Sequence, residues 1–312
     1  MPPKPEAGDD PRPTMHCGFA ALVGRPNAGK STLLNHLVGE KLAIVSDKPQ
    51  TTRHRILGVR HYPGGQVAFL DTPGIHRPLH RMNVQMVESA VETFRQADVL
   101  VVVVDASAKT GQGDRFLLSL LERVTTPTFL ALNKIDRIAK PQLLPLIEWY
   151  RTRRTFAEVI PISALTGEGV DVLERLLLDR MPDGDPLYPT DYLTDQPERF
   201  FASEIVREKV LRHTRAELPF STAVVIDRFE EADGAGGIVR LYASILVDRA
   251  SQKAIVIGRQ GSLVARIGTE AREELERFFG RRVFLDLHVR VRPNWREDTR
   301  WLAEMGLRPG SH

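Results

Sequence analysis

The stretch that decides the fold reads Gly24-Arg25-Pro26-Asn27-Ala28-Gly29-Lys30-Ser31-Thr32. It fits the pattern G-x-x-x-x-G-K-[ST], and it lies between an apolar run, Phe19–Val23, and a helical segment, Lys30–Val38. Glycines in such a loop let backbone N–H groups surround phosphate oxygens, and the positive end of the helix faces the same group. Lys30 is then expected to bridge the β- and γ-phosphates, and the Ser31 hydroxyl to ligate Mg²⁺. An ordinary glycine-rich turn would leave Lys30 and Ser31 without a role.

Strand and helix patterns alternate from Gly18 to Met181, which predicts a parallel sheet covered by helices on both faces. The run Val99–Val104 is apolar on both faces, as a central parallel strand must be. The other expected strands are Phe19–Val23, Val67–Leu70, Phe129–Leu132 and Val159–Ile162. The expected helices are Lys30–Val38, Asp114–Arg123, Leu143–Thr152 and Val170–Arg180.

A candidate metal and γ-phosphate element, Asp71-Thr72-Pro73-Gly74, follows the expected strand Val67–Leu70. A carboxylate at that strand end can hold Mg²⁺ through water, and the Gly74 N–H can meet the γ-phosphate. Taken alone, D-x-P-G is a common turn. Downstream of a phosphate-binding loop it predicts the second half of a nucleotide site.

Guanine recognition is indicated by Asn133-Lys134-Ile135-Asp136, which follows the expected strand Phe129–Leu132. The Asp136 carboxylate can accept hydrogen bonds from guanine N1–H and N2–H₂, and adenine would leave it unpaired. The stem of Lys134 can lie over the base. Ser163-Ala164, after another strand, would place a backbone N–H near guanine O6. Together these elements predict a site for GTP and GDP.

The C-terminal part follows a segment of linker composition, 182–186, with Pro189 and Pro197 beyond it. This part contains a loop with two glycines, Gly258-Arg259-Gln260-Gly261. Such a loop can press its backbone against nucleotides, because glycine has no side chain in the way. G-x-x-G alone is a weak pattern that most often marks a turn. The elements expected around it are a helix at Glu198–Arg212, strands at Ser221–Phe229 and Val239–Val247, a helix at Ser262–Phe279 and a strand at Val283–Arg292.

The chain resembles the Era family of translation-factor-type GTPases over nearly its whole length after the N-terminal tail. The resemblance rests on Gly24–Thr32, on Gln50–Arg55, and on Asp71–Gly74 followed by Ile75 and His76. The order helix–strand–strand–helix–GxxG–helix–strand resembles a type II KH domain, and Gln252–Gly268 and Arg290–Trp295 resemble the Era KH domain. The resemblance to the Era family implies an α/β P-loop GTPase domain with a mostly parallel sheet, followed by an α+β type II KH domain.

The expected division of the chain is a disordered tail at 1–14, a GTPase domain at 15–182, a linker at 183–199, a KH domain at 200–300 and a tail at 301–312. No apolar run is long enough to span a membrane, and the single cysteine, Cys17, excludes an intramolecular disulfide and favours packing. Residues 1–199 carry 24 basic and 24 acidic side chains, and residues 200–312 carry 19 and 16. The basic excess therefore lies in the last third, a weak hint of a polyanion-binding module.

Hydrolysis is expected to differ from that of Ras-like proteins, because Ile75 follows D-x-x-G where those proteins have a water-orienting Gln. One interpretation is a protein that binds GTP and hardly hydrolyses it. The other rests on Asn27, since the resemblance implies that an Asn here helps to hold K⁺ beside the phosphates. Thr51 or Thr52 would complete the Mg²⁺ site, and the match to related GTPases favours Thr52. The expected catalytic group is then Asn27, Lys30, Thr52 and Gly74, and the expected Mg²⁺ ligands are Ser31, Thr52 and Asp71.

RNA contacts are expected from the four GxxG residues, Gly258, Arg259, Gln260 and Gly261, and from Arg266, His288, Arg290 and Arg292. Taken singly, each of these arginines reads as a solvated surface charge, except Arg259, which lies inside the loop. Trp295 reads more as a packing residue.

The resemblance implies a protein that binds the 3′ end of 16S rRNA in its GTP state and is released by hydrolysis during assembly of the small ribosomal subunit. A monomer is expected, since nothing in the sequence requires a dimer. It also implies a cytoplasmic protein with some peripheral association with the inner face of the cell membrane. Two alternatives stay open: an RNA chaperone for which GTP is only a structural ligand, and a membrane-associated cell-cycle switch that acts through protein partners.

Overall fold

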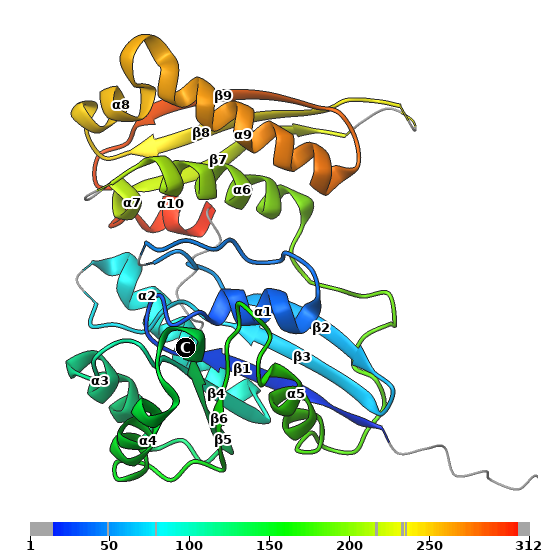
Figure 1. Ribbon diagram of the computed structural model, residues 1–312. Helices are drawn as coiled ribbons and strands as arrows, with labels where there is room; N and C mark the ends of the chain where they lie inside the picture. Colours follow the sequence, from blue (N-terminus) through cyan, green and yellow to red (C-terminus); the bar gives the residue numbers. More distant parts are fainter. Residues whose placement is uncertain are drawn as a thin grey trace, which may run out of the picture.

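The computed structural model describes residues 15–48, 50–78, 80–215, 218–231, 234 and 236–304 as two domains stacked on one another (Figure 1). The expected tail at 1–14, and residues 305–312 of the expected C-terminal tail, lie outside the described residues. The expected fold classes, α/β for the N-terminal part and α+β for the C-terminal part, are confirmed.

The N-terminal domain is built on a six-stranded sheet with the order β2-β3-β1-β4-β5-β6. All neighbouring strands are parallel except β2, which pairs antiparallel with β3 at one edge. The strands are β1 (His16–Val23), β2 (Ile56–Tyr62), β3 (Gly65–Asp71), β4 (Val99–Asp105), β5 (Thr128–Asn133) and β6 (Glu158–Pro161). Because β1, β3, β4, β5 and β6 are parallel, their carboxyl ends meet at one edge of the sheet, where the nucleotide motifs follow.

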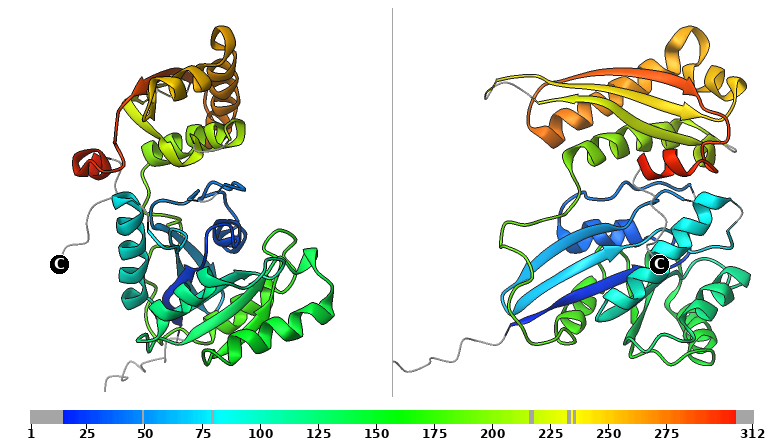
Figure 2. Two further views of the ribbon diagram at one scale, coloured as in Figure 1. Left: turned by 90° about the vertical axis from the view of Figure 1, so that its left-hand side faces the viewer. Right: turned by 180° about the vertical axis from the view of Figure 1, so that it is seen from behind.

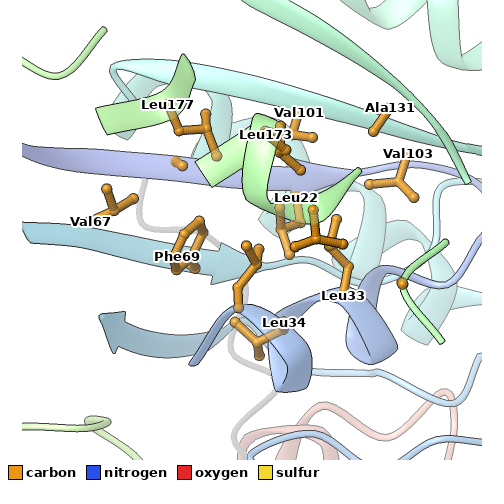
Figure 3. Packing of buried hydrophobic residues seen from close by; sticks show 14 of the residues in the cluster. Leu22, Leu33, Leu34, Val67, Phe69, Val101, Val103, Ala131, Leu173 and Leu177 are labelled. Atoms are coloured by element: carbon orange, nitrogen blue, oxygen red, sulfur yellow. The ribbon is translucent and has the colours of Figure 1, made fainter. Parts of the chain in front are cut away.

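Helices cover both faces of this sheet and enclose two apolar cores. On one face, α1 (Lys30–Val38) and α5 (Val170–Leu178) pack on the strands, and Leu33, Leu34 and Leu173 are fully buried in one apolar cluster with Phe69 (Figure 3). The other face is covered by α2 (Arg81–Gln96), α3 (Gln112–Leu121) and α4 (Leu143–Arg151). Short 3₁₀ turns at Ile135–Arg137 and Lys140–Gln142 precede α4.

The C-terminal domain is a three-stranded sheet with the order β7-β8-β9, in which β8 is antiparallel to β7 and parallel to β9. Helices α6, α8 and α9 enclose the core on one face of this sheet, and α10 lies on the other side (Figure 2). The elements are α6 (Glu198–His213), α7 (Leu218–Ser221), β7 (Thr222–Glu230), β8 (Val239–Val247), α8 (Ala250–Ile257), η3 (Arg259–Gly261), α9 (Ser262–Phe279), β9 (Val283–Val291) and α10 (Thr299–Glu304).

The segment between the domains does not hang free but runs along the N-terminal domain. The Gln66 side chain bonds to both backbone polar groups of Tyr188, at 2.8 and 3.0 Å, and Val59 N donates to Leu193 O at 2.9 Å. Helix α6 begins at Glu198, inside the expected linker.

The expected C-terminal tail at 301–312 starts within packed structure, because α10 carries the fully buried Leu302 into a small apolar cluster with Met82, Met86 and Trp295. The apolar pair Trp301-Leu302 is the sequence signal for this extension of the domain.

Candidate functional site

The phosphate-binding loop connects β1 to α1, and α1 begins at Lys30 as the motif requires. Gly29 has φ +96°, and a Cβ atom there would lie 2.2 Å from Nδ2 of Asn133, so only glycine fits. The Lys30 ammonium folds back over the loop and donates to the carbonyls of Gly24 (3.3 Å) and Arg25 (3.1 Å). Burial lowers the pKa of Lys30, and the charge of Asp71 opposes this shift.

Three oxygen-bearing side chains converge beside this loop. Ser31 Oγ lies 2.6 Å from Thr52 Oγ1 and donates to Asp71 Oδ2 at 2.7 Å. Asp71 is fully buried, and its Oδ1 has no partner among the described residues. Burial raises the pKa of Asp71 to about 6, although Lys30 and the two hydroxyls lower it. A buried carboxylate with a free oxygen and two adjacent hydroxyls is a donor set that suits Mg²⁺.

Of the two candidate threonines, the structure brings Thr52 and not Thr51 to this cluster. The Thr51 hydroxyl donates to the carbonyl of Lys48 at 2.6 Å. Thr52 Oγ1 lies 3.5 Å from Asp71 Oδ2 in addition to its contact with Ser31.

The turn Asp71-Thr72-Pro73-Gly74 rests directly on the phosphate-binding loop. The Thr72 hydroxyl donates to Leu22 O at 2.8 Å, and a Cβ atom on Gly74 would lie 2.8 Å from three atoms of Pro26. Ile75 is fully buried in the apolar core on the sheet face that α2, α3 and α4 cover. Its N–H donates to Gly24 O at 3.0 Å. The Ile75 side chain therefore faces the core.

The base-recognition motif is held together by the buried amide of Asn133. Its Nδ2 donates to Ala28 O at 2.8 Å, and its Oδ1 accepts from Ala164 N at 2.9 Å, so it joins the phosphate loop to the loop after β6. Asp136 is exposed, and its Oδ1 accepts from Ser163 Oγ at 2.6 Å. Lys134 has φ +67°, which turns the chain so that Asp136 can face a base.

Asp105, at the end of β4, is a site residue that sequence reasoning missed. Its carboxylate pairs with Lys134 Nζ at 2.6 Å, and Lys134 also donates to Asn27 O at 2.7 Å. Burial would raise the pKa of Asp105, but the bonds from Lys134 and Ser107 bring it below its ordinary value. The signal was available in the sequence, since Asp105 directly follows the apolar run Val99–Val104.

A pocket of about 500 Å³ lies over these motifs, which is within the usual range for small-ligand sites. A larger cavity of about 870 Å³ lies between the two domains and contains none of the phosphate-loop residues. The smaller pocket is lined by Pro26, Asn27, Gly29, Lys30, Ser31, Thr32, Ile44, Val45, Ser46, Asp47, Gln50, Thr51, Thr52, Gly74, Asp105, Asn133, Lys134, Asp136, Arg137, Ala164 and Leu165.

The GxxG loop in the C-terminal domain forms an exposed tip between α8 and α9. Gly258, Gln260 and Gly261 all have positive φ, at +73°, +52° and +79°. A Cβ atom on Gly258 would lie 2.7 Å from Leu263 Cβ, whereas one on Gly261 would meet nothing within 4 Å. Arg259 and Gln260 are exposed, so the loop offers its backbone and a cation to solvent.

The other expected RNA contacts do not gather at this loop. Arg266 lies on α9 and pairs with Glu270 at 3.2 Å. His288 and Arg290 alternate with Leu287 and Val289, which face the helix-covered core, and so lie on the opposite face of the sheet. Arg290 pairs there with Asp227 at 3.3 Å.

Two side chains near the end of the domain differ in burial, since Arg292 is exposed and Trp295 is buried. The Arg292 guanidinium lies 5.1 Å from the ring centroid of Trp301. Trp295 is buried, and its Nε1 donates to Ser221 O at 3.0 Å, as expected of a packing residue.

The fold and the site together define a P-loop GTPase domain joined to a KH domain. Residues 19–134 match the family described as "50S ribosome-binding GTPase", and residues 217–296 match the family described as "KH domain". GTPase Era of Geobacter metallireducens is 48% identical over 289 residues, covering 93% of this chain and 97% of the relative. GTPase Era of Syntrophus aciditrophicus is 50% identical over 289 residues, covering 93% of this chain and 94% of the relative. The chain belongs to the Era family of GTPases.

A solved structure agrees with this assignment over both domains. The crystal structure of Era in complex with MgGDPNP and nucleotides 1506–1542 of 16S ribosomal RNA superposes with a TM-score of 0.91 at 40% identity, covering 94% of this chain and 99% of that one. Among the described residues, no helix is both long and apolar enough to cross a membrane.

Proposed function

We propose that this protein is a GTP-controlled RNA-binding protein that binds the 3′ end of 16S rRNA and assists rRNA processing and assembly of the small ribosomal subunit. The observation that carries the proposal is the contact between the nucleotide site and the KH domain, which is made by Lys41, Val45, Thr51 and Arg53. In Figure 1 the segment between α1 and β2 runs directly below α6 and α7. The Era crystal structure with MgGDPNP and 16S rRNA supports the choice of ligands.

The nucleotide site is proposed to bind GTP and GDP and to hydrolyse GTP. Lys30 and the loop backbone hold the β- and γ-phosphates, and Asp136 selects guanine. Ser31 and Thr52 would ligate Mg²⁺ directly and Asp71 through water, in keeping with their convergence at 2.6 and 2.7 Å. Bound Mg²⁺ supplies positive charge to the phosphate oxygens.

Hydrolysis is proposed to be stimulated by K⁺. The Nδ2 of Asn27 donates to the carbonyl oxygen of Asp47 at 2.7 Å, so the Asn27 amide, which also carries an oxygen, lies beside a carbonyl of the segment after α1. Oxygen atoms of this kind suit a monovalent cation, which would supply the charge that an arginine finger gives elsewhere. The burial of Ile75 leaves that side chain without a part in orienting water.

The KH domain is proposed to hold RNA at the loop formed by Gly258, Arg259, Gln260 and Gly261. Arg266 extends this surface along α9, while His288, Arg290 and Arg292 would serve contacts outside it. We place the protein in the cytoplasm as a monomer. Peripheral contact with the inner face of the cell membrane stays a prediction that rests on the family resemblance.

The test is to titrate an oligonucleotide of the 16S rRNA 3′ end onto the protein at fixed salt, loaded either with GDP or with a non-hydrolysable GTP analogue. A switch of ordinary strength should tighten RNA binding roughly 5- to 150-fold in the GTP state. Replacing Arg259 and Gln260 by Asp should abolish RNA binding and leave GTP affinity unchanged, because two carboxylates would face the phosphates of the RNA.

The matched control is Arg277→Asp, which places a carboxylate at the exposed far end of α9. It should retain RNA binding. Identical RNA affinities with GDP and with the GTP analogue would reduce the chain to two independent binding domains and overturn the proposal.

A further inference from the structure

Helix α6 of the KH domain is buried on two sides, and the two sides differ in chemistry. One side carries Ala202, Val206 and Val210 into the apolar core of the KH domain. The other carries Glu204, Arg207 and Glu208, which are no more than 7% exposed and face the GTPase domain. We name these three residues the α6 charged stripe. Positions three and four apart on a helix share a face, so the stripe presents its charges together.

Arg207 contacts the backbone immediately before Thr52. Its Nη2 donates to the carbonyl of Thr51, which belongs to the peptide that joins Thr51 to Thr52. The same guanidinium is fixed by Glu204, which accepts from Nε at 2.7 Å and from Nη2 at 2.6 Å. A bidentate carboxylate pair of this kind sets the orientation of the guanidinium as well as its charge.

The KH domain also holds the residue immediately after Thr52. Arg53 is buried, and it donates to Thr222 O at 2.7 Å and to Pro219 O at 3.1 Å. Its guanidinium lies 5.6 Å from the ring centroid of Trp295. Thr52 is therefore held between two neighbours that are both fastened to the other domain.

Glu208 fastens the start of the same segment. Its Oε1 accepts from Val45 N at 3.1 Å, and its Oε2 pairs with Lys41 Nζ at 2.8 Å. Lys41 also pairs with Glu274 of α9 at 2.5 Å. Buried charges are costly unless their partners are in place, so this set of contacts specifies one position for the segment.

We propose that Arg207, oriented by Glu204, is a positioning residue for Thr52, so that helix α6 of the KH domain completes the metal site of the GTP state. The inference rests on the proposed role of Thr52 as a Mg²⁺ ligand. GDP is held by the phosphate loop and the base motif, neither of which contacts α6. The preference of the protein for GTP over GDP should then depend on the KH domain even without RNA.

The experiment compares the affinities of the full-length protein for GDP and for a non-hydrolysable GTP analogue, by calorimetry in Mg²⁺ and without RNA. Arg207→Lys keeps the charge beside Glu204 but loses the planar fork. The double variant Glu204→Gln/Arg207→Gln removes both buried charges together, so neither is left unpaired. Both should weaken binding of the GTP analogue about tenfold or more, the usual loss for a hydrogen bond to a charged group, and leave GDP affinity within about twofold. More Mg²⁺ should also be needed for half-maximal binding of the analogue.

The matched control is Arg212→Lys, an exposed arginine on the last turn of α6 whose ion pair, with Glu270, stays within the KH domain. It should bind both nucleotides as the parent chain does. Equal weakening of GDP and analogue binding in the Arg207 variants, or no weakening of either, would overturn the positioning role. Because RNA is absent, either result leaves the RNA switch to be decided by its own titration. Wild-type binding of the analogue that does not depend on Mg²⁺ would overturn the role of Thr52 itself.

Discussion

Replacing Asn133 by alanine should weaken the whole nucleotide site, because its amide joins three segments. The change removes the donor to Ala28 O at 2.8 Å, and the acceptor of Ala164 N at 2.9 Å and of Lys134 N at 2.8 Å. Ala28 and Ala164 are 2% and 3% exposed, so their backbone groups lose their partner out of reach of bulk water. Each buried backbone group left without a partner lowers the free energy of unfolding by about 1–3 kcal/mol. The half-buried Lys134 N–H can instead form a hydrogen bond with water.

Water entering the space of the lost amide should offset part of this cost. We therefore expect the free energy of unfolding to fall by about 2–4 kcal/mol, or roughly 5–15 °C in Tm for a domain of this size. Asn133 does not reach the Mg²⁺ cluster, so affinities for GDP and for a GTP analogue should fall together, by about tenfold or more.

Scanning calorimetry and isothermal titration measure the two effects, with Gln142→Ala, an exposed amide of the same domain, as the control. A variant that melts with the parent chain and binds GDP normally would refute the reasoning that Asn133 ties the loops together.

Three further predictions concern Asp136, Asn27 and Glu274. Asp136→Asn should shift preference from GTP to XTP, because it replaces an acceptor by a donor; competition binding that still favours GTP would show that another group reads the base. GTP turnover should be faster in K⁺ than in Na⁺ at equal ionic strength, and Asn27→Ala should remove the difference while GDP binding stays nearly intact; equal rates in the two salts would return the weak-hydrolysis interpretation. Burial acts to raise the pKa of Glu274, but its bonds from Lys209 and Lys41 bring it below the ordinary 4.5. A lowered folded pKa gives stability that is present above pH 4.5 and lost as the pH falls through the folded value. Glu274→Gln should therefore cost about 1–3 kcal/mol at neutral pH, and denaturation curves of the two chains should converge in acid; a gap that persists at low pH would contradict this.

The nucleotide site could be predicted from the sequence because each motif directly follows an apolar strand. In a parallel sheet the strand ends meet, so Lys30, Asp71 and Asp136 had to lie near one another. Helices Lys30–Val38 and Ser262–Phe279 were predicted with the bounds that the structure has, since each begins after a glycine with positive φ and ends before another.

Other elements escaped prediction for physical reasons. Strand β2 lies at the sheet edge, and its last three residues are not buried. Helix α2 has an apolar face at helical spacing, formed by Met82, Met86, Ala90 and Phe94. It also buries the polar side chains of Asn83, Gln85 and Thr93, which the sequence alone would place in solvent. The α6 charged stripe was not predicted, because charges at helical spacing look like a solvated face until a second domain covers them. Strand β9 alternates as expected, but alternation does not say which face binds RNA.

The fastening of residues 183–197 along β2 and β3 has a consequence for how the domains separate. Bonds from Gln66 and Val59 shorten the free length of the connection, so if the domains separated, the KH domain would pivot close to the start of α6. Reclosing is then an intramolecular event at a high effective concentration, which depends little on how much protein is present. Lengthening the connection should lower the effective concentration of the KH domain at the surface of the GTPase domain. The length of one short segment therefore sets how often the two domains are in contact.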